Sequence, residues 1–459
     1  MTISSLNAAS LNATASNTPL LASVAVRNST ASMPATTSAG TATSSALAPT
    51  PSVIVTLSGA TTAPLSPIYS PQPVTPPPAW QNASIAIKTA SGRNLTLSLG
   101  DDGGLSLKPD GDAPLSNAES VAIAKLAVAF KNALDGMASS SPQLDLAGLA
   151  QVDTSVLSSI HITAQASGTG KAIQTVDFTA DATSRSVKID GQAGNIDVSV
   201  DLSSPALSGS QTQQASAINN YLRQFDQAAS RGHASPALMT MFKDAFTQMN
   251  APAGLDAVPL TRPSTWVTET DHALLSGLAD FSASVTQTAT ASNPYRANEH
   301  DAFSLQVSQT TQMSGRDPSE RGISQTSSSQ LRASFHTPLS ADAPLNLTGD
   351  PKSQNYYYTQ IDDSAQSNMK IGYQKGKLVQ ASLTRTASQN TQQQKYVMGQ
   401  MVEDITTPLK RTQQRDLLPL LDQMNRHPPQ TQQERDARKR DLANLHDSVL
   451  FESDPTALA

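Results

Sequence analysis

The 459-residue sequence contains no cysteine. This absence excludes disulfide bonds, a thiolate nucleophile and cysteine-ligated zinc or iron–sulfur sites. A cysteine-free chain also suits passage into an oxidising compartment, where free thiols are readily oxidised. Aromatic residues make up 4% of the chain and charged residues 15%, and both fractions are low for an enzyme with a dense core and a charged surface.

Membrane, secretory and nucleic-acid signals are also missing. No run of about 18 apolar residues is present, so the sequence predicts no membrane-spanning helix. The first charged residue is Arg27, so no basic segment precedes an apolar one, as it would in a secretory signal peptide. The formal net charge is -6, which provides no basic surface for a phosphate backbone, and we expect no nucleic-acid partner.

Recognisable catalytic motifs are absent as well. The sequence has no HExxH, no GxSxG and no dinucleotide-binding glycine fingerprint, and its seven histidines lack metal-ligand spacing. The segment Gly168 to Lys171 looks like a phosphate-binding loop, but Gln165 replaces its first glycine and Ala172 its magnesium-binding hydroxyl residue. The run Glu299 to Asp301 groups three functional side chains, yet neighbours on one backbone do not generally converge on one substrate atom. We therefore predict no metal and no cofactor, and we lean towards a protein that is not an enzyme.

Residues 1–81 form a tail rich in Ser, Thr, Ala and Pro, which we expect to be disordered. Such a composition buries too little apolar surface to offset the entropy of ordering the chain. Tyr69 to Trp80 is dense in proline, which favours an extended polyproline II spacer.

The first twelve residues, MTISSLNAASLN, are small, polar and uncharged, with apolar residues at spacings that make a transient helix faintly amphipathic. Residues 1–25 resemble the uncleaved export signals of bacterial type III and flagellar secretion substrates. The resemblance implies a secreted protein that meets an export chaperone, with a signal carried by Ile3, Ser4, Ser5, Leu6 and Leu11. The alternative is a plain disordered tail on a cytoplasmic protein.

The remainder predicts an α+β fold, with antiparallel β-sheets and packed helices. We divide it into an α+β domain at residues 82–262, made of a β-meander and helices, and a β-rich region with C-terminal helices at residues 263–459. Period-2 alternation predicts a hairpin from Ala83–Thr89 and Leu95–Leu99, and a meander over residues 157–202. Alternating tyrosines at residues 356–358 should face opposite sides of a strand.

Helix signals lie between and after these strands. A capping box at Ser116 to Glu119 predicts a helix to about Leu134, and we expect its apolar face to contain Val121, Leu126, Val128 and Phe130. A helical pair follows at residues 211–230 and 235–250.

Two C-terminal helices are predicted at residues 411–424 and 430–451, with charge pairs at i,i+4 spacing on the second. Arg435, Arg438, Lys439 and Arg440 could dock an acidic partner, or they form an ordinary solvated helix face.

These features favour a non-enzymatic, exported protein that binds a protein partner or builds a surface structure. Two alternatives stay open: an intracellular binding or adaptor domain, and a hydrolase whose site has no recognisable motif.

Overall fold

A computed structural model describes residues 55–57, 80–100, 103–111, 114–137, 144–167, 173–252, 266–340, 342, 344–426 and 429–458. They belong to one compact unit, Ser52–Ala459. The predicted tail lies almost wholly outside the described residues, as do the phosphate-loop look-alike at residues 168–171 and the expected domain boundary at 262/263.

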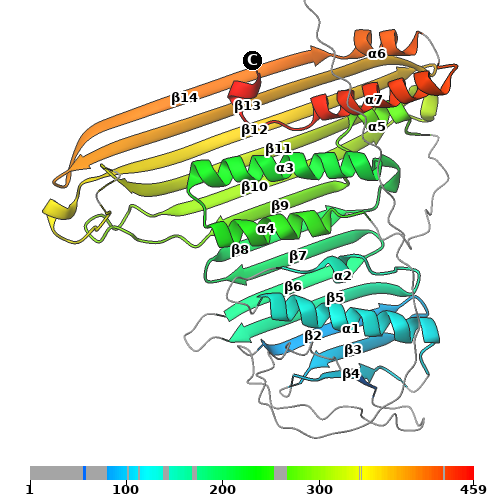
Figure 1. The fold of residues 1–459 in the computed structure, drawn as a ribbon, viewed down its shortest axis with the longest axis horizontal. Helices are drawn as coiled ribbons and strands as arrows, with labels where there is room; N and C mark the ends of the chain where they lie inside the picture. Colours follow the sequence, from blue (N-terminus) through cyan, green and yellow to red (C-terminus); the bar gives the residue numbers. More distant parts are fainter. Residues whose placement is uncertain are drawn as a thin grey trace, which may run out of the picture. The chain divides into compact units, whose positions relative to one another are not determined.

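The described residues contain fourteen strands in one sheet, seven α-helices and four short 3₁₀ helices (Figure 1). The strands are β1 (Val55–Leu57), β2 (Trp80–Thr89), β3 (Asn94–Leu99), β4 (Leu105–Pro109), β5 (Leu157–Ser167), β6 (Ile173–Asp181), β7 (Ser184–Gly191), β8 (Gly194–Asp201), β9 (Asp280–Gln287), β10 (Ala302–Ser314), β11 (Gly322–Pro338), β12 (Tyr356–Gln374), β13 (Lys377–Val397) and β14 (Gln400–Asp416). The helices are α1 (Asn117–Met137), α2 (Ala147–Ala150), α3 (Gln211–Gly232), α4 (Pro236–Met249), α5 (Glu269–Leu274), α6 (Leu418–Asn425), α7 (Gln432–Val449), η1 (Pro205–Leu207), η2 (Pro318–Glu320), η3 (Pro351–Ser353) and η4 (Pro455–Leu458).

The sheet runs in the order β1-β4-β3-β2-β5 and then in sequence order to β14. Every pairing is antiparallel except that of β1 with β4. The predicted antiparallel strands and packed helices are thus present, but the strands form one sheet rather than several. The sheet is also continuous between the two predicted regions, because β8 pairs with β9 along its length.

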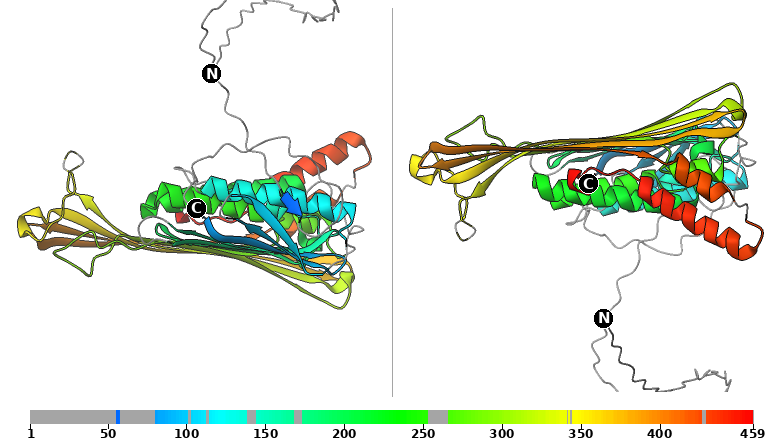
Figure 2. Two further views of the ribbon diagram at one scale, coloured as in Figure 1. Left: turned by 90° about the horizontal axis from the view of Figure 1, so that it is seen from below. Right: turned by 90° about the horizontal axis from the view of Figure 1, so that it is seen from above.

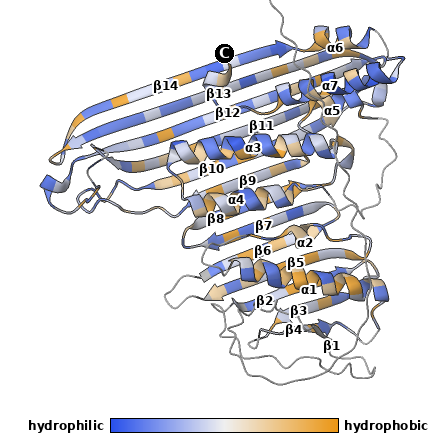
Figure 3. Cartoon of the chain, viewed as in Figure 1, coloured by the Kyte–Doolittle hydropathy of each residue, from blue (hydrophilic) through white to orange (hydrophobic). Residues whose placement is uncertain are grey.

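All the labelled helices lie on one face of this sheet, which we call the helix face; the opposite surface is the open face (Figure 2). Helices α1, α3 and α4 bury their apolar stripes against the strands in one continuous core. Hydrophobic and hydrophilic residues alternate along the strands, as expected for a sheet covered on one side (Figure 3). No helix in the described part of the chain is long and apolar enough to cross a membrane.

The predicted hairpin, meander and helical pair are confirmed as β2–β3, β5–β8 and α3–α4. The capping box at the start of α1 is also confirmed, because Ser116 N donates to Glu119 Oε2 at 2.8 Å and Glu119 N donates to Ser116 Oγ at 3.2 Å. The predicted apolar face of α1 is partly wrong. Leu126 and Phe130 are buried as predicted, but Val121 and Val128 are 56% and 46% exposed, and Ile123 and Ala127 are buried in addition.

The first predicted C-terminal helix, at residues 411–424, is wrong in its first part. Residues 411–416 are not helical but belong to β14, which pairs with β13 from Gln400 to Asp416. The helix is restricted to α6, which begins at Leu418. The second predicted C-terminal helix is confirmed as α7.

The last strands are long, and β10–β14 extend beyond the ends of α3 and α4 (Figure 1). Two tight turns connect the longest of them. In the β13–β14 turn, Met398 and Gly399 have φ of 53° and 79°, as a type I′ hairpin requires. We call the part of β10–β14 that lies beyond the helices the wing.

Candidate functional site

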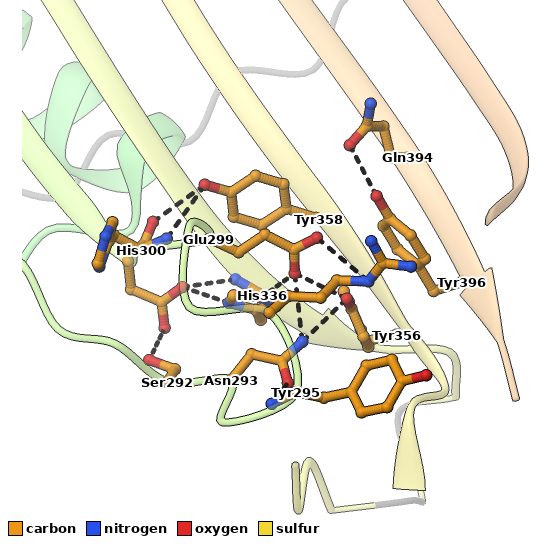
Figure 4. Close-up of polar contacts among 12 residues, drawn as sticks. Ser292, Asn293, Tyr295, Glu299, His300, His336, Tyr356, Tyr358, Gln394 and Tyr396 are labelled. Carbon is orange, nitrogen blue, oxygen red and sulfur yellow. Dashed lines mark hydrogen bonds and ion pairs between the residues drawn. The ribbon is translucent and has the colours of Figure 1, made fainter. Parts of the chain in front are cut away.

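A polar cluster lies on the open face of the wing, where the β9–β10 connection returns to the sheet (Figure 4). An isolated bridge between Thr290 and Asp301 closes this connection, and β10 begins at the next residue. The ladder with β11 begins at Ala302, which pairs with Ser334. The carboxylates of Glu299 and Asp301, just before this ladder, meet the imidazole of His336, two residues beyond Ser334.

Both ring nitrogens of His336 contact a carboxylate. Nε2 lies 3.0 Å from Glu299 Oε2, and Nδ1 lies 2.6 Å from Asp301 Oδ1. The imidazole is fully buried, and the carboxylate of Glu299 is 6% exposed. We call these three residues the histidine clamp.

Further donors hold the two carboxylates in place. Tyr356 donates its hydroxyl to Glu299 Oε2 at 2.7 Å, and Asn293 Nδ2 donates to the same oxygen at 3.2 Å. Ser292 donates to Asp301 Oδ2 at 2.6 Å. The lone pairs of both carboxylates are thus satisfied by donors from three separate stretches of the chain, which is what a buried charged group requires.

The charge state of the clamp follows from these contacts. Burial alone would lower the pKa of His336, but its hydrogen bonds to Asp301 and Glu299 and their negative charges outweigh burial and raise the pKa to about 9. Burial acts to raise the pKa of Glu299, yet hydrogen bonds from His336, Tyr356 and Asn293 lower it. At neutral pH the clamp is therefore an imidazolium held between two carboxylates.

Tyrosines surround the clamp on the same face. Tyr356, Tyr358 and Tyr396 form a buried cluster, whereas Tyr357 points to the other face, as the strand alternation predicted. Tyr358 donates its hydroxyl to the His300 carbonyl at 3.2 Å. The rings of Tyr356 and Tyr358 pack against the imidazole, with ring centroids 5.0 Å and 4.7 Å from it.

The run Glu299 to Asp301 was not expected to converge on one substrate atom, and Glu299 and Asp301 contact different nitrogens of the His336 ring. Both carboxylates reach the imidazole from outside the regular ladder, where Glu299 N donates to the Arg296 carbonyl in a turn and Asp301 forms the isolated bridge with Thr290. The signal that was missing is His336, which is distant in sequence and is brought near only by the β10–β11 register.

A second feature is a hollow of about 860 Å³ on the helix face, between α3 and the strands β10–β13. The part lined by β10 and β11 is mainly apolar, whereas the part lined by β12 and β13 carries mainly hydroxyls, amides and a carboxylate. The C-terminal segment after α7 forms part of its wall. Its lining includes Leu305, Leu331, Ile361, Thr391, Gln393 and Phe451.

One ion pair lies inside this hollow. Arg231, in the last turn of α3, places Nε 2.5 Å from Asp363 Oδ2 and Nη2 3.1 Å from Asp363 Oδ1. The same Nη2 donates to Thr391 Oγ1 at 2.9 Å. This two-bond pairing neutralises the guanidinium and joins α3 to β12 and β13.

The basic residues predicted to dock a partner lie on α7. Arg438 is occupied in fixing α6 to α7, because it donates to the Met424 carbonyl at 3.1 Å and to Asn425 Oδ1 at 2.9 Å. Arg435 contacts Gln432 on its own helix, while Lys439 and Arg440 are exposed. Arg438 and Arg435 thus have partners inside the chain.

The predicted signal residues, Ile3 to Leu11, lie outside the described residues. Among the residues that the structure does describe, no group of three or more His, Asp or Glu side chains is arranged to hold a metal ion. Comparison of the chain with family models, with curated proteins and with solved structures finds no match.

Proposed function

We propose that this chain is a non-enzymatic binding protein whose helix-face hollow takes a neutral small molecule with an apolar body and a hydrogen-bonding head. The observation that carries the proposal is the hollow itself, in which the apolar side chains of Leu305, Leu331 and Ile361 lie among the hydroxyls and amides of β12 and β13. Its volume of about 860 Å³ lies in the range of small-molecule sites, which combine apolar walls with a few polar groups.

The charges around the hollow favour a neutral ligand. The guanidinium of Arg231 is already matched by Asp363, and Asp226 pairs with Lys243 at 2.7 Å. Asp454 accepts hydrogen bonds from Thr456 N and Oγ1 in its own turn. A ligand that pairs with Arg231 or Asp363 would have to displace the other of the two and leave its partly buried charge uncompensated. Thr391 and Gln393 instead offer neutral donors and acceptors.

The histidine clamp supports a binding role over the hydrolase alternative. A catalytic histidine needs one ring nitrogen within reach of the substrate. Both nitrogens of His336 contact carboxylates, and its imidazole is fully buried. The clamp is therefore better explained as a structural contact that holds the β9–β10 connection on the wing.

We keep export as part of this proposal. Its support is the resemblance of residues 1–25 to type III and flagellar export signals. A reporter fused to residues 1–30 should leave a type III-competent cell and stay inside a cell that lacks the export ATPase. Retention in both cells would remove export from the proposal and leave ligand binding unaffected.

The ligand proposal is tested with Nile red, a neutral apolar dye that fluoresces strongly out of water. We expect the full chain to bind the dye saturably, with blue-shifted emission. Gln393→Trp places a large ring at the exposed rim of the hollow and should weaken binding about tenfold or more. Gln360→Trp is the matched control, because Gln360 is exposed on the open face of the neighbouring strand β12 and does not line the hollow.

A second blocking variant, Leu331→Trp, fills the apolar part of the hollow, and its circular dichroism spectrum shows whether the fold is kept. If the wild-type chain shows no saturable binding, or if Gln360→Trp weakens binding as much as Gln393→Trp does, the hollow is not the site.

A further inference from the structure

The strand β14 (Gln400–Asp416) forms an exposed edge of the sheet, away from the ligand hollow. The sheet order ends at β14, and no strand among the described residues pairs with its outer side. Nearly all of its side chains are exposed, including Met401, Val402 and Ile405 at 52%, 57% and 49%. A long edge strand offers unpaired N–H and C=O groups, which are a template for another strand.

The charges of β14 are divided between its two halves. Glu403 and Asp404 lie in the first half, whereas Lys410, Arg411 and Arg415 lie in the second, where Asp416 is the last residue of the strand. No ion pair within the described part of the chain involves Glu403, Lys410 or Arg411. A partner strand with the reverse order of charge would complement this edge.

A second copy of the same strand has that order when it runs antiparallel. With the two-fold axis at Thr407, Glu403 faces Arg411 of the second copy and Asp404 faces Lys410. Ile405 then faces Leu409. Each pair joins residues of the same parity, so Glu403 and Arg411 share the helix face while Asp404 and Lys410 share the open face. Opposite charges directly across antiparallel strands stabilise the pair.

A parallel arrangement of two β14 strands lacks this pairing of opposite charges. A parallel, in-register pair would place Glu403 beside Glu403 and Arg411 beside Arg411, and like charges directly opposite destabilise a strand pair. The antiparallel arrangement also uses the whole edge in both copies, so it closes as a dimer and does not continue into a fibre.

Pro408 weakens the antiparallel pairing of the two β14 strands. Pro408 has no N–H to donate, and on an edge strand a proline is placed where the missing N–H faces solvent. In the two-fold pair Pro408 faces Thr406, so each copy forgoes one main-chain hydrogen bond beside the axis. This loss makes the contact weaker than uninterrupted strand pairing.

We propose that this protein forms a two-fold dimer through antiparallel pairing of β14 with β14 of a second copy, centred on Thr407. The interaction joins the two sheets edge to edge, with ion pairs on both faces of the junction.

The first test uses charge exchange and sedimentation velocity of the full chain. Glu403→Arg and Arg411→Glu each turn two attractive pairs into repulsive ones and should weaken dimerisation at least about tenfold. An equimolar mixture of the two variants restores opposite charges at every pair, so it should form a heterodimer. Glu403→Arg mixed with Lys410→Asp carries the same total charge but leaves repulsive pairs, and it should stay monomeric.

The second test exploits the absence of cysteine. Thr407→Cys places the two thiols directly across the axis, where Cα atoms of antiparallel strands lie about 4.5–5.5 Å apart, within reach of a disulfide. Ile405→Cys is the matched control, because its two copies are offset by four residues, or about 13 Å along the strands. Mild oxidation should cross-link Thr407→Cys rapidly and Ile405→Cys slowly.

Three results would overturn the proposal. They are a monomeric wild-type chain, a Glu403→Arg and Lys410→Asp mixture that dimerises as well as the complementary one, and equal cross-linking at positions 405 and 407. In each of these cases β14 is simply an edge protected by its charges and its proline.

Discussion

Replacing His336 with Gln should remove a defined, pH-dependent part of the stability. Gln is uncharged, so it leaves Glu299 and Asp301 facing each other without a cation between them. Breaking a buried ion pair by removing one partner usually costs about 3–5 kcal/mol. We expect a loss of this size near pH 6, where the imidazole of the wild-type chain is charged in both the folded and unfolded states.

The pH dependence follows from the raised pKa. The folded pKa of His336 is about 9, against an ordinary pKa of 6.5 for histidine, a difference worth about 3 kcal/mol. Because the folded chain holds the proton more tightly, this stabilisation is complete below about pH 6.5. It is lost as pH rises through about 9. The carboxylates act in the opposite direction, since their lowered pKa values add stability that is lost at acid pH.

The assay is urea unfolding of the wild-type chain and His336→Gln at about pH 6 and about pH 10. Taking the difference between the unfolding free energies of the two proteins cancels the contribution of every group that titrates equally in both. We expect the difference in unfolding free energy to be about 3 kcal/mol larger at the lower pH. His161→Gln is a matched control, because His161 contacts Asp177 on the exposed side of β5 and such surface pairs contribute little. A wild-type minus His336→Gln difference that is the same at both pH values would refute the assignment of an imidazolium.

Three further substitutions probe the scaffold by urea unfolding. Gly194→Ala should lower the free energy of unfolding by about 3 kcal/mol, because Gly194 has φ of +145° and an added Cβ would collide with the Thr286 carbonyl. An unchanged urea midpoint would contradict this. Glu119→Gln should lower the free energy of unfolding by about 1 kcal/mol at neutral pH and by less near pH 2, since hydrogen bonds from Ser91 and Ser116 hold the Glu119 pKa at about 2. A loss of stability that does not depend on pH would argue against this. Arg185→Met should cost about 2 kcal/mol, because the buried guanidinium donates to the Met249 and Ala251 carbonyls, and a stability equal to the wild type would exclude that role.

Local patterns were sufficient for most of the elements. The alternation in β5–β8 and the capping box before α1 each arise from a few neighbouring residues, so they can be recognised without knowledge of the rest of the fold. The failure at residues 411–416 has a physical cause. Arg and Gln have good helix propensity, but pairing with β13 along its length outweighs propensity in this segment.

The positions of Val121 and Val128 were mistaken for a different reason. A helix of small residues such as α1 presents several possible apolar stripes, and only the packed sheet determines which one is buried. The sheet selects the side with Ile123, Leu126 and Phe130. Valines on the other side stay exposed at little cost, since single apolar side chains are common on protein surfaces.

The clamp and the hollow were not predictable from the sequence. His336 lies 37 residues from Glu299, and Arg231 lies 132 residues from Asp363. Each pair meets only because strand register and helix packing bring distant segments together. A single sequence without motifs contains no signal for such contacts.

The clamp and the β14 edge are physically connected through Arg296. This side chain lies 3.8 Å from Glu299 and over the ring of Tyr396, and it donates to the Gly399 carbonyl at 2.9 Å. Gly399 belongs to the turn from which β14 begins, four residues before Glu403. Arg296 therefore links the clamp to the turn that precedes the acidic half of the edge strand. Neutralising His336 loosens the segment that holds this turn, so β14 self-pairing should weaken under the alkaline conditions that discharge the clamp.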